Sequence, residues 1–338
     1  MNLFRDNVER MAGYTPGEQP QDKKYVKLNT NECPYPASPK VFEAIKAAAN
    51  PDLRLYPDPM AARFRVKLAE VYGFSPGEII AGQGGDDILN LIVRACAARG
   101  DVVASLYPSY TLYDTLAELQ EAEFVRVDKV EELTGTGAKV NFVCNPNAPT
   151  GEWTEMDALA ALAPKLGGLL VVDEAYADFA EDTCLPLVRR HANVIVVRTM
   201  SKSFSLAGMR LGYGIAQAPV IEQLFKVKES YNLDRISLAA AEAALDDLEH
   251  VEANVRRVIA TRERLKGALR GMGLFFYPSR SNFVFLRIDN ARAVKQELMA
   301  RGVLVRHFDT PDLKEFIRVT VGSDEEIDRF LTELKGIV

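Results

Sequence analysis

Three short apolar runs in the middle of the chain constrain its fold most strongly. They lie near residues 140, 170 and 195, and segments with helical spacing separate them. Strands that alternate with helices in this way are typical of an α/β layer with a mostly parallel sheet. Ligands bind such sheets beyond the carboxyl ends of the strands. Since polar residues follow each run directly, we expect a binding site at that edge.

The run Val194–Val197 leads to a lysine that lies among small hydroxyl residues. From Thr199 to Arg210 the segment reads T-M-S-K-S-F-S-L-A-G-M-R, so Lys202 precedes a fixed cation by eight positions. Burial and a nearby positive charge both disfavour the ammonium form of lysine and lower its pKa. A neutral lysine amine attacks aldehydes. By itself, however, a Ser-Lys pair more often marks a solvated lysine beside a helix cap.

The run Leu169–Val172 ends at an acid, in the sequence D-E-A-Y from Asp173 to Tyr176. A buried carboxylate is costly unless a cation or a hydrogen-bond donor meets it. A protonated pyridine nitrogen would meet this need, and the pair would hold the ring as an electron sink. Considered alone, Asp173 is better explained as the cap of a following helix.

Two turns add polar groups at the same edge. The run Val140–Cys144 continues into N-P-N-A-P-T-G, a turn that either presents amides to a ring hydroxyl or only reverses the chain. The second turn, G-Q-G-G-D-D from Gly82, leads into an amphipathic helix, whose free amides would bind phosphate. It is not a dinucleotide fingerprint, because Asp87 occupies the place of the third glycine. With the lysine segment it predicts a phosphate cup, formed by backbone amides of Gly84, Gly85 and Asp86 and closed by Thr199, Ser201 and Arg210.

In this order, N-P-N-A-P-T-G, D-E-A-Y and S-K-S-F-S-L-A-G-M-R resemble the aminotransferases of pyridoxal-phosphate fold type I, and in detail the histidinol-phosphate aminotransferases. The resemblance extends from Leu28 to Gly322. It implies a large α/β domain with a mostly parallel sheet between helices, and a smaller α+β domain. We expect an N-terminal arm and part of the small domain in residues 1–40, the large cofactor-binding domain in 41–245 and the small domain in 246–338.

The resemblance also implies roles for individual residues. Lys202 would hold pyridoxal 5'-phosphate covalently and later act as acid-base catalyst, while Asp173 pairs with the pyridine nitrogen and Tyr176 meets the ring hydroxyl. Family members commonly carry asparagine before P-T-G to meet that hydroxyl, whereas this chain has Ala148, so the neighbouring Asn147 is the candidate replacement.

Other residues match positions that contact cofactor or substrate in the family. Tyr110 would stack on the cofactor ring, and Tyr56 in R-L-Y-P would cross a homodimer interface to the neighbouring cofactor phosphate. The substrate would meet Tyr14, Asn31, Arg306 and Arg318. From the residues alone, Arg318 inside an apolar strand indicates either a buried salt bridge or an anion site.

The implied reaction is a transamination between L-histidinol phosphate and 2-oxoglutarate, giving imidazole acetol phosphate and L-glutamate in histidine biosynthesis. An aromatic-amino-acid aminotransferase and a threonine-phosphate decarboxylase would show the same core motifs. A third possibility is a catalytically silent, aminotransferase-like binding protein. The intact Lys202, Asp173 and Arg210 favour an enzyme.

Composition excludes other classes. With a net charge of -6, the chain of 338 residues lacks the basic footprint of a nucleic-acid-binding protein. No apolar run approaches the ~20 residues that a membrane span needs, and Met1–Asp6 lacks the apolar core of a signal peptide, so we expect a cytoplasmic protein. Four scattered cysteines and three scattered histidines predict neither disulfides nor a metal site.

Beyond the large domain, helical spacing predicts helices over 237–269 with a break near Asp247. Strands are expected around Phe275, over Asn282–Arg287 and over Phe316–Val321.

Overall fold

The computed structural model describes residues 3–13 and 17–338, whose strands form two separate sheets. The larger sheet has the order β2-β8-β7-β6-β5-β3-β4 and is parallel except for β8, which runs antiparallel to both of its neighbours. Its strands are β2 (Ile79–Gly82), β3 (Val102–Leu106), β4 (Glu123–Val127), β5 (Val140–Cys144), β6 (Leu169–Asp173), β7 (Val194–Thr199) and β8 (Gly212–Ala216). The three apolar runs near residues 140, 170 and 195 form the adjacent strands β5, β6 and β7.

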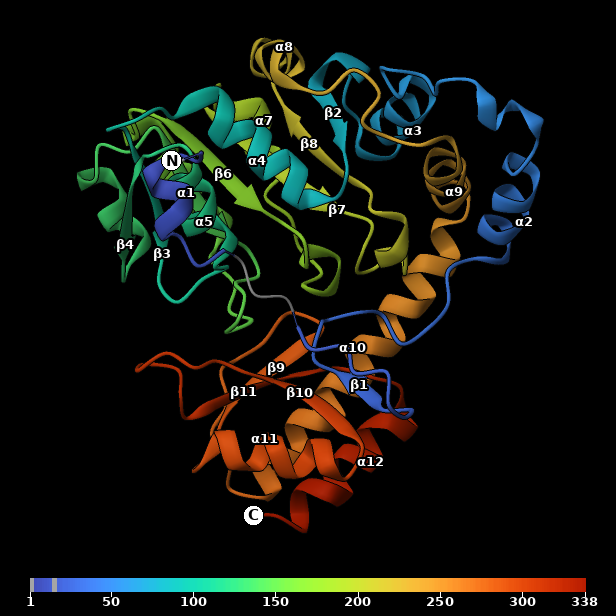
Figure 1. The fold of residues 1–338 in the computed structure, drawn as a ribbon, viewed down its shortest axis with the longest axis vertical. Helices are drawn as coiled ribbons and strands as arrows, with labels where there is room; N and C mark the ends of the chain where they lie inside the picture. The colour runs from blue at the N-terminus through green and yellow to red at the C-terminus, as the bar shows by residue number, and fades with distance from the viewer. Residues whose placement is uncertain (1–2, 14–16) are drawn as a thin grey trace.

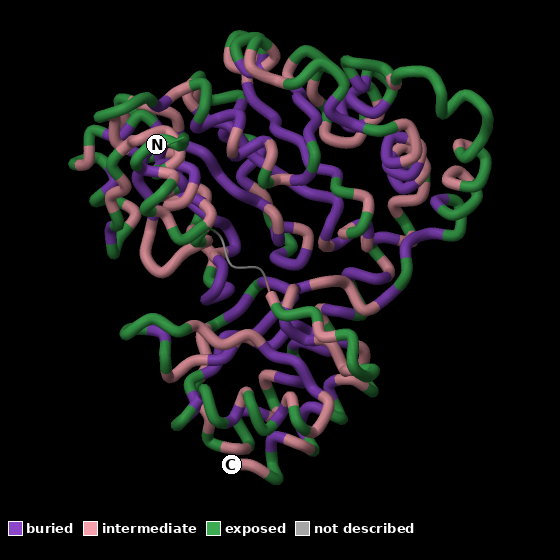
Figure 2. The backbone as a smooth tube through the Cα atoms, in the orientation of Figure 1, coloured by how far each residue is buried: buried purple, intermediate pink, exposed green. Residues whose placement is uncertain are grey.

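Helices bury both faces of this sheet, which is why its central strands are almost continuously apolar. Figure 2 shows the strands as a buried layer beneath more exposed helices. α4 packs against β2, β7 and β8, α5 against β3 and β4, and α8 against β2 and β8. The helices of this lobe are α3 (Ala62–Tyr72), α4 (Gly85–Cys96), α5 (Leu112–Leu119), α6 (Met156–Leu162), α7 (Pro186–Arg190) and α8 (Ala218–Val227).

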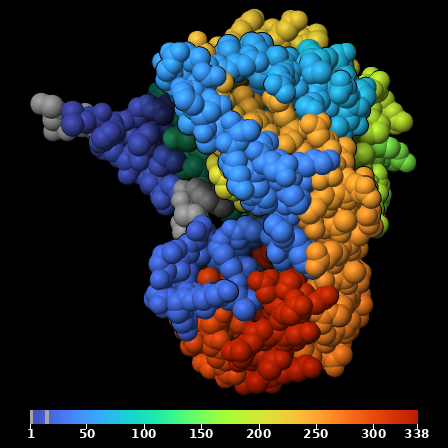
Figure 3. Space-filling view, turned by 90° about the vertical axis from the view of Figure 1, so that its right-hand side faces the viewer, coloured from blue at the N-terminus to red at the C-terminus, as the bar shows by residue number. Residues whose placement is uncertain are grey.

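The smaller sheet combines one strand from the N-terminal region with three strands from the C-terminal region. Its order is β1-β10-β11-β9, with β1 (Val26–Leu28) parallel to β10 (Val303–His307), and β11 (Phe316–Thr320) antiparallel to both β10 and β9 (Phe283–Arg287). Helices α11 (Ala291–Ala300) and α12 (Asp324–Lys335) pack with this lobe. In Figure 3 part of the blue N-terminal region lies against the red C-terminal part. The pairing of β1 with β10 supports the prediction that residues 1–40 contribute to the small domain; the domain boundaries themselves stay a prediction.

One long helix connects the two lobes. α10 (Leu248–Gly271) runs from the larger lobe down along the smaller one (Figure 1). It follows α9 (Arg235–Leu245), against which α2 (Pro39–Ala48) packs, and a short helix α1 (Asp6–Arg10) lies near α5. The break between α9 and α10 falls at the predicted place, near Asp247.

The predicted strand around Phe275 is wrong. Only an isolated bridge forms there, between Phe276 and Leu286, and the Phe275 side chain is exposed. Two backbone hydrogen bonds join the segment to β9, from Tyr277 N to Phe285 O and from Arg287 N to Phe275 O, and the pairing does not extend into a strand.

No helix in the described part of the chain combines the length and the apolar character needed to cross a bilayer.

Candidate active site

The carboxyl ends of β5, β6 and β7 open into a cavity of about 270 Å³ between the two lobes. Most of the predicted site residues line it. From the larger lobe these are Gly85, Asp86, Tyr110, Asp173, Tyr176, Thr199, Ser201, Lys202 and Arg210; Asn31, Arg306 and Arg318 line the opposite side. The structure therefore brings together residues separated by almost the whole chain.

Lys202 lies in the turn after β7, with its amine buried in this cavity. The amine donates a hydrogen bond to the carbonyl oxygen of Thr30 at 3.1 Å. Burial, followed by the positive charge of Arg318, lowers the pKa of Lys202 to about 8. The neutral, nucleophilic amine is thus more accessible near neutral pH than for a solvated lysine.

Asp173 is the last residue of β6 and is almost fully buried. Its carboxylate accepts hydrogen bonds from the Tyr113 hydroxyl at 2.8 Å and from the Ala175 amide at 3.1 Å. Burial raises the pKa of Asp173 to about 6. Among the ion pairs of the described residues, none includes this carboxylate. A cationic ring nitrogen would compensate the cost of its burial.

Tyr113 is a site residue that sequence reasoning missed. It lies on α5, is fully buried and stacks on Phe142 of β5, with 4.2 Å between the ring centroids. A core aromatic on an amphipathic helix has the same sequence signal, so only the contact of its hydroxyl with Asp173 reveals the second role.

An anion cradle forms where α4 begins. Gly84 precedes the helix with φ +83°, and a Cβ there would lie 2.7 Å from the Arg210 guanidinium. Arg210 Nη1 lies 3.3 Å from Ser201 Oγ, and Arg210 Nη2 lies 3.4 Å from Asp86 Oδ2. Free helix amides, hydroxyls and a guanidinium fork are the groups that hold a phosphate.

Tyr110 and Tyr176 border the same space. The Tyr110 hydroxyl donates to Asp86 Oδ1 at 3.2 Å, and its ring packs edge-on against Tyr113. The Tyr176 hydroxyl accepts a hydrogen bond from the Asn31 amide at 2.9 Å. Burial raises the pKa of Tyr176, which keeps its proton.

Two arginines approach from the smaller lobe. Arg306 on β10 and Arg318 on β11 are direct partners in the strand register, and both line the cavity. The Arg318 guanidinium lies 5.2 Å from the ring centroid of Phe283 and donates to the carbonyl oxygen of Asn29 at 3.3 Å. Their position suits a ligand with an anionic end.

Three of the predicted residues that the structure describes are absent from the cavity lining: Gly84, Asn147 and Tyr56. Asn147 is turned away, because its amide donates to Pro108 O and Thr150 Oγ1 and its oxygen accepts from Ser109. Ala148 occupies the cavity wall instead, so the structure does not support Asn147 as the replacement amide. Tyr56 is 78% exposed and stacks on Tyr231. Tyr14 lies outside the described residues.

The family aminotransferase class I and II matches residues 23–334. The chain belongs to this family. The histidinol-phosphate aminotransferase of Citrifermentans bemidjiense is 45% identical over 346 residues, which cover 100% of this chain and 99% of the relative. Histidinol-phosphate aminotransferase 1 of a Nostoc species is 41% identical over 100% of this chain and 98% of its own length.

Solved structures of aminotransferases share the fold. The histidinol-phosphate aminotransferase of Sinorhizobium meliloti, in complex with pyridoxal-5'-phosphate, has a TM-score of 0.91 at 26% identity and covers 100% of this chain and 99% of its own. A double mutant of the Thermus thermophilus aspartate aminotransferase, at 22% identity, has a TM-score of 0.81 with both chains fully covered, and this likeness supports the fold only. The predicted family, fold and enzyme class are confirmed.

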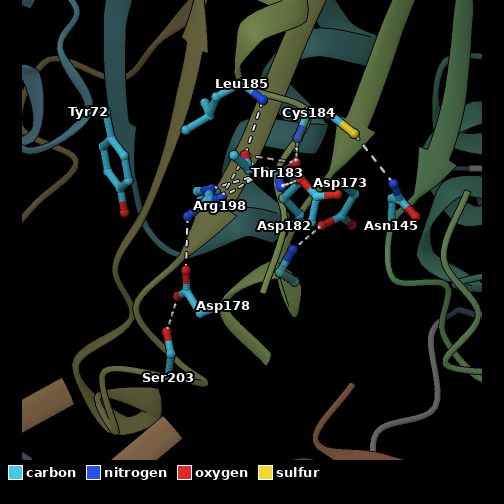
Figure 4. A network of polar contacts seen from close by, with 12 residues as sticks. Tyr72, Asn145, Asp173, Asp178, Asp182, Thr183, Cys184, Leu185, Arg198 and Ser203 are labelled. Carbon is cyan, nitrogen blue, oxygen red and sulfur yellow. Dashed lines mark hydrogen bonds and ion pairs between the residues drawn. The ribbon is translucent and has the colours of Figure 1, made fainter. Parts of the chain in front are cut away.

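In this aminotransferase a largely buried ion-pair network lies at the edge of the sheet that carries Asp173 and Lys202 (Figure 4). Arg198 on β7 binds Glu174 at 2.7 Å and Asp178 at 2.9 Å, and Asp178 accepts a hydrogen bond from Ser203. Glu174 follows Asp173, and Ser203 follows Lys202. The network therefore ties the two turns that carry the acid and the amine to each other, a connection that the sequence alone did not reveal.

The described residues contain no group of three or more His, Cys, Asp or Glu side chains able to hold a metal ion.

Proposed function

We propose that this aminotransferase uses pyridoxal 5'-phosphate to exchange an amino group between L-histidinol phosphate and 2-oxoglutarate. The products are imidazole acetol phosphate and L-glutamate, a step of histidine biosynthesis. One observation carries the proposal: the buried Lys202 amine and the buried Asp173 carboxylate share a cavity with an anion cradle. Relatives that are 45% identical over their full length carry the name of this activity.

The residues present fit the cofactor. The cradle at Gly84, Gly85, Ser201 and Arg210 suits its phosphate, Asp173 offers a carboxylate for the ring nitrogen, and Tyr176 a hydroxyl for the ring oxygen. When bound, the cofactor supplies an electron sink for charge that develops at the substrate carbon.

The protein's own groups bind, orient and move protons. Lys202 has its pKa lowered to about 8, so it acts first as nucleophile and afterwards as proton carrier. Asp173 remains ionised at neutral pH, because its raised pKa of about 6 is still below 7. Arg306 and Arg318 bind the anionic end of the substrate, a phosphate for one partner and a carboxylate for the other.

The proposal includes a homodimer. Large apolar side chains are exposed around residues 53–60, and Tyr231 lies beside them. These are Leu53, Leu55, Tyr56, Met60 and Tyr231. In a homodimer, Tyr56 would reach the partner's cofactor phosphate. We also propose that the enzyme works in the cytoplasm.

The first test is chemical labelling. Borohydride reduction of the cofactor-loaded enzyme, followed by peptide mapping, is expected to place the label on Lys202. Lys202→Ala should lose turnover by at least about 10⁴-fold while retaining its fold, because it removes both nucleophile and proton carrier. Lys165→Ala is the matched control and should be labelled like the wild type. A label elsewhere, or near-normal turnover of the variant, contradicts the proposal.

The substrate is tested by spectral titration. L-Histidinol phosphate should change the visible spectrum of the loaded enzyme at lower concentration than tyrosine or threonine phosphate. A spectral change at a lower concentration of tyrosine than of L-histidinol phosphate would indicate an aromatic-amino-acid aminotransferase instead. Release of carbon dioxide from threonine phosphate would indicate a decarboxylase. No colour with added cofactor would leave a silent binding protein.

A further inference from the structure

The turn after β5 presents no amide side chain to the cavity. Ala148 presents a methyl group there, and the amide of Asn147 donates to Thr150 of the same turn and to Pro108 of the loop after β3. A ring oxygen in the cavity therefore depends on the Tyr176 hydroxyl for a hydrogen bond from this side. The direction of that hydroxyl's proton then becomes important.

Asn31 controls the direction of the Tyr176 proton. Its amide nitrogen donates to the Tyr176 hydroxyl at 2.9 Å, and both side chains are buried. A hydroxyl has one proton to donate and can accept with its lone pairs. Because the Tyr176 oxygen accepts from Asn31, its own proton is available to a group in the cavity.

Two further residues fix the orientation of Asn31. The backbone N–H of Asn31 donates to Thr320 Oγ1 at 2.9 Å, and the Thr320 hydroxyl donates to Asn31 Oδ1 at 3.1 Å. Asn282 donates to the carbonyl oxygen of Asn31 at 3.0 Å. With Oδ1 held by Thr320, the amide nitrogen is the end that faces Tyr176.

The backbone of Asn31 supports the same interpretation. Its φ is +57°, in the left-handed region that few non-glycine residues adopt. Such conformations persist where surrounding contacts hold them, and they are frequent at functional sites. Here the held conformation is the one that lets the side chain bridge Thr320 and Tyr176.

We propose that Asn31, oriented by Thr320, aims the Tyr176 proton at the ring oxygen of the cofactor and so replaces the amide that position 148 lacks. This inference rests on the proposed function. It makes Asn31 a positioning residue that acts through Tyr176, and it connects the smaller lobe, through β11, to the electronic state of the cofactor.

The expected consequence is spectroscopic. A hydrogen bond donated to the ring oxygen withdraws electron density from it and weakens its hold on the proton of the nitrogen that joins Lys202 to the cofactor. The pKa of that nitrogen is therefore lowered when Tyr176 donates well. Visible absorbance against pH measures this pKa directly and requires no turnover.

The test compares absorbance midpoints of cofactor-loaded variants. Asn31→Gly removes the amide and tolerates the positive φ. We expect its midpoint to rise by about 0.5 to 1 pH unit, the size of one hydrogen bond. Tyr176→Phe should raise it at least as much, and Asn31→Gly with Tyr176→Phe should not exceed Tyr176→Phe alone. Ala148→Asn in the Asn31→Gly background should return the midpoint toward wild type.

Thr320→Val keeps the side-chain shape and removes the hydroxyl, so it should shift the midpoint in the same direction as Asn31→Gly. Thr261→Val is the matched control, since this buried threonine binds Asp324 away from the cavity, and its midpoint should equal that of the wild type. If Asn31→Gly does not fold, the absorbance midpoint of Thr320→Val tests the inference in its place.

An unchanged midpoint in Asn31→Gly, or additive shifts in the double variant, would overturn the inference while Lys202 labelling still supported the proposed function. A wild-type enzyme that gains no cofactor colour would overturn both.

Discussion

Burial favours the neutral form of both Asp173 and Lys202, although it shifts their pKa values in opposite directions. It raises the pKa of the acid to about 6 and lowers that of the amine to about 8. Each shift means that the charged group destabilises the cofactor-free fold. A cofactor with a cationic ring nitrogen and an aldehyde would relieve both costs. The site therefore suits the bound cofactor, and its buried charges lower the stability of the cofactor-free protein.

The substitution Asp173→Asn tests whether the buried charge lowers the stability of the cofactor-free protein. A folded-state pKa of about 6 against 3.8 means that the folded protein binds more protons, so the free energy of unfolding falls as pH rises from about 4 to 6. The cofactor-free variant escapes this loss and should be more stable than wild type at pH 8, by up to about 3 kcal/mol, with no gain at pH 4. Urea unfolding at both pH values measures the difference.

The exposed Asp289→Asn is the control for Asp173→Asn and should change stability little at either pH. Greater stability of Asp173→Asn should come with weaker cofactor binding. A variant less stable than wild type at pH 8 would show that the hydrogen bonds from Tyr113 and Ala175 outweigh the cost of burying the charge.

At the scale of elements, the cradle depends on how closely β8 approaches the start of α4. A Cβ at Gly212 would lie 2.3 Å from the carbonyl carbon of Gly84. No side chain fits there, so glycine sets the position of the helix amides relative to Arg210. Sequence reasoning identified the glycines of the turn but not this one, which belongs to the facing strand.

Gly212→Ala should displace the cradle. Overpacking of this kind costs about 1 to 3 kcal/mol, and we expect cofactor affinity to fall by about tenfold or more. Equilibrium titration with pyridoxal phosphate measures it. Gly267→Ala on α10 adds a methyl group that meets nothing beyond its own helix within 4 Å and should leave affinity unchanged. Equal affinity of the two variants would refute the role of the close approach.

The ion-pair network gives a second prediction at this scale. Arg198→Met leaves Glu174 buried without its cation and should lower the free energy of unfolding by about 3 to 5 kcal/mol. Arg99→Met, which breaks the exposed pair with Glu121, should cost at most about 1 kcal/mol. Chemical denaturation compares them. Similar losses for the two variants would mean that the network contributes no more than a surface pair.

At the scale of the whole molecule, the cavity lies between lobes built from both ends of the chain, and the proposed dimer would complete it. Tyr56 is exposed in the single chain and lies off the cavity wall. Its predicted contact with a cofactor phosphate therefore requires a second subunit.

Hybrid dimers test this arrangement. Neither Lys202→Ala nor Tyr56→Ala homodimers should show full activity, but a hybrid of the two contains one site with both the lysine and the partner's tyrosine. Co-expression with two affinity tags should give a hybrid with about half the turnover of wild type. A hybrid no more active than half of Tyr56→Ala would place Tyr56 outside the partner's site.

The sequence by itself determined the order of strands and helices in the larger lobe and the edge of the sheet at which the site lies. Apolar periodicity reports burial, and the polar residue after each strand marks its carboxyl end. The roles of Asp173, Lys202 and Arg210 were predicted from the ordered set of motifs and the family it resembles, because Asp173 and Lys202, each taken alone, are better explained as a helix cap and a solvated lysine. The glycines before α4 likewise predicted a phosphate-binding turn.

Only the tertiary structure decided which side chains point into the cavity and what they touch. Asn147 was expected there from adjacency, yet its side chain bonds to Thr150 of its own turn and to Pro108 and Ser109 of the loop after β3. Tyr113 reaches Asp173 from a helix 60 positions away, and Asn31 meets Thr320 across 289 positions. Side-chain direction depends on partners brought together by packing, and those partners leave no trace in the spacing of nearby residues.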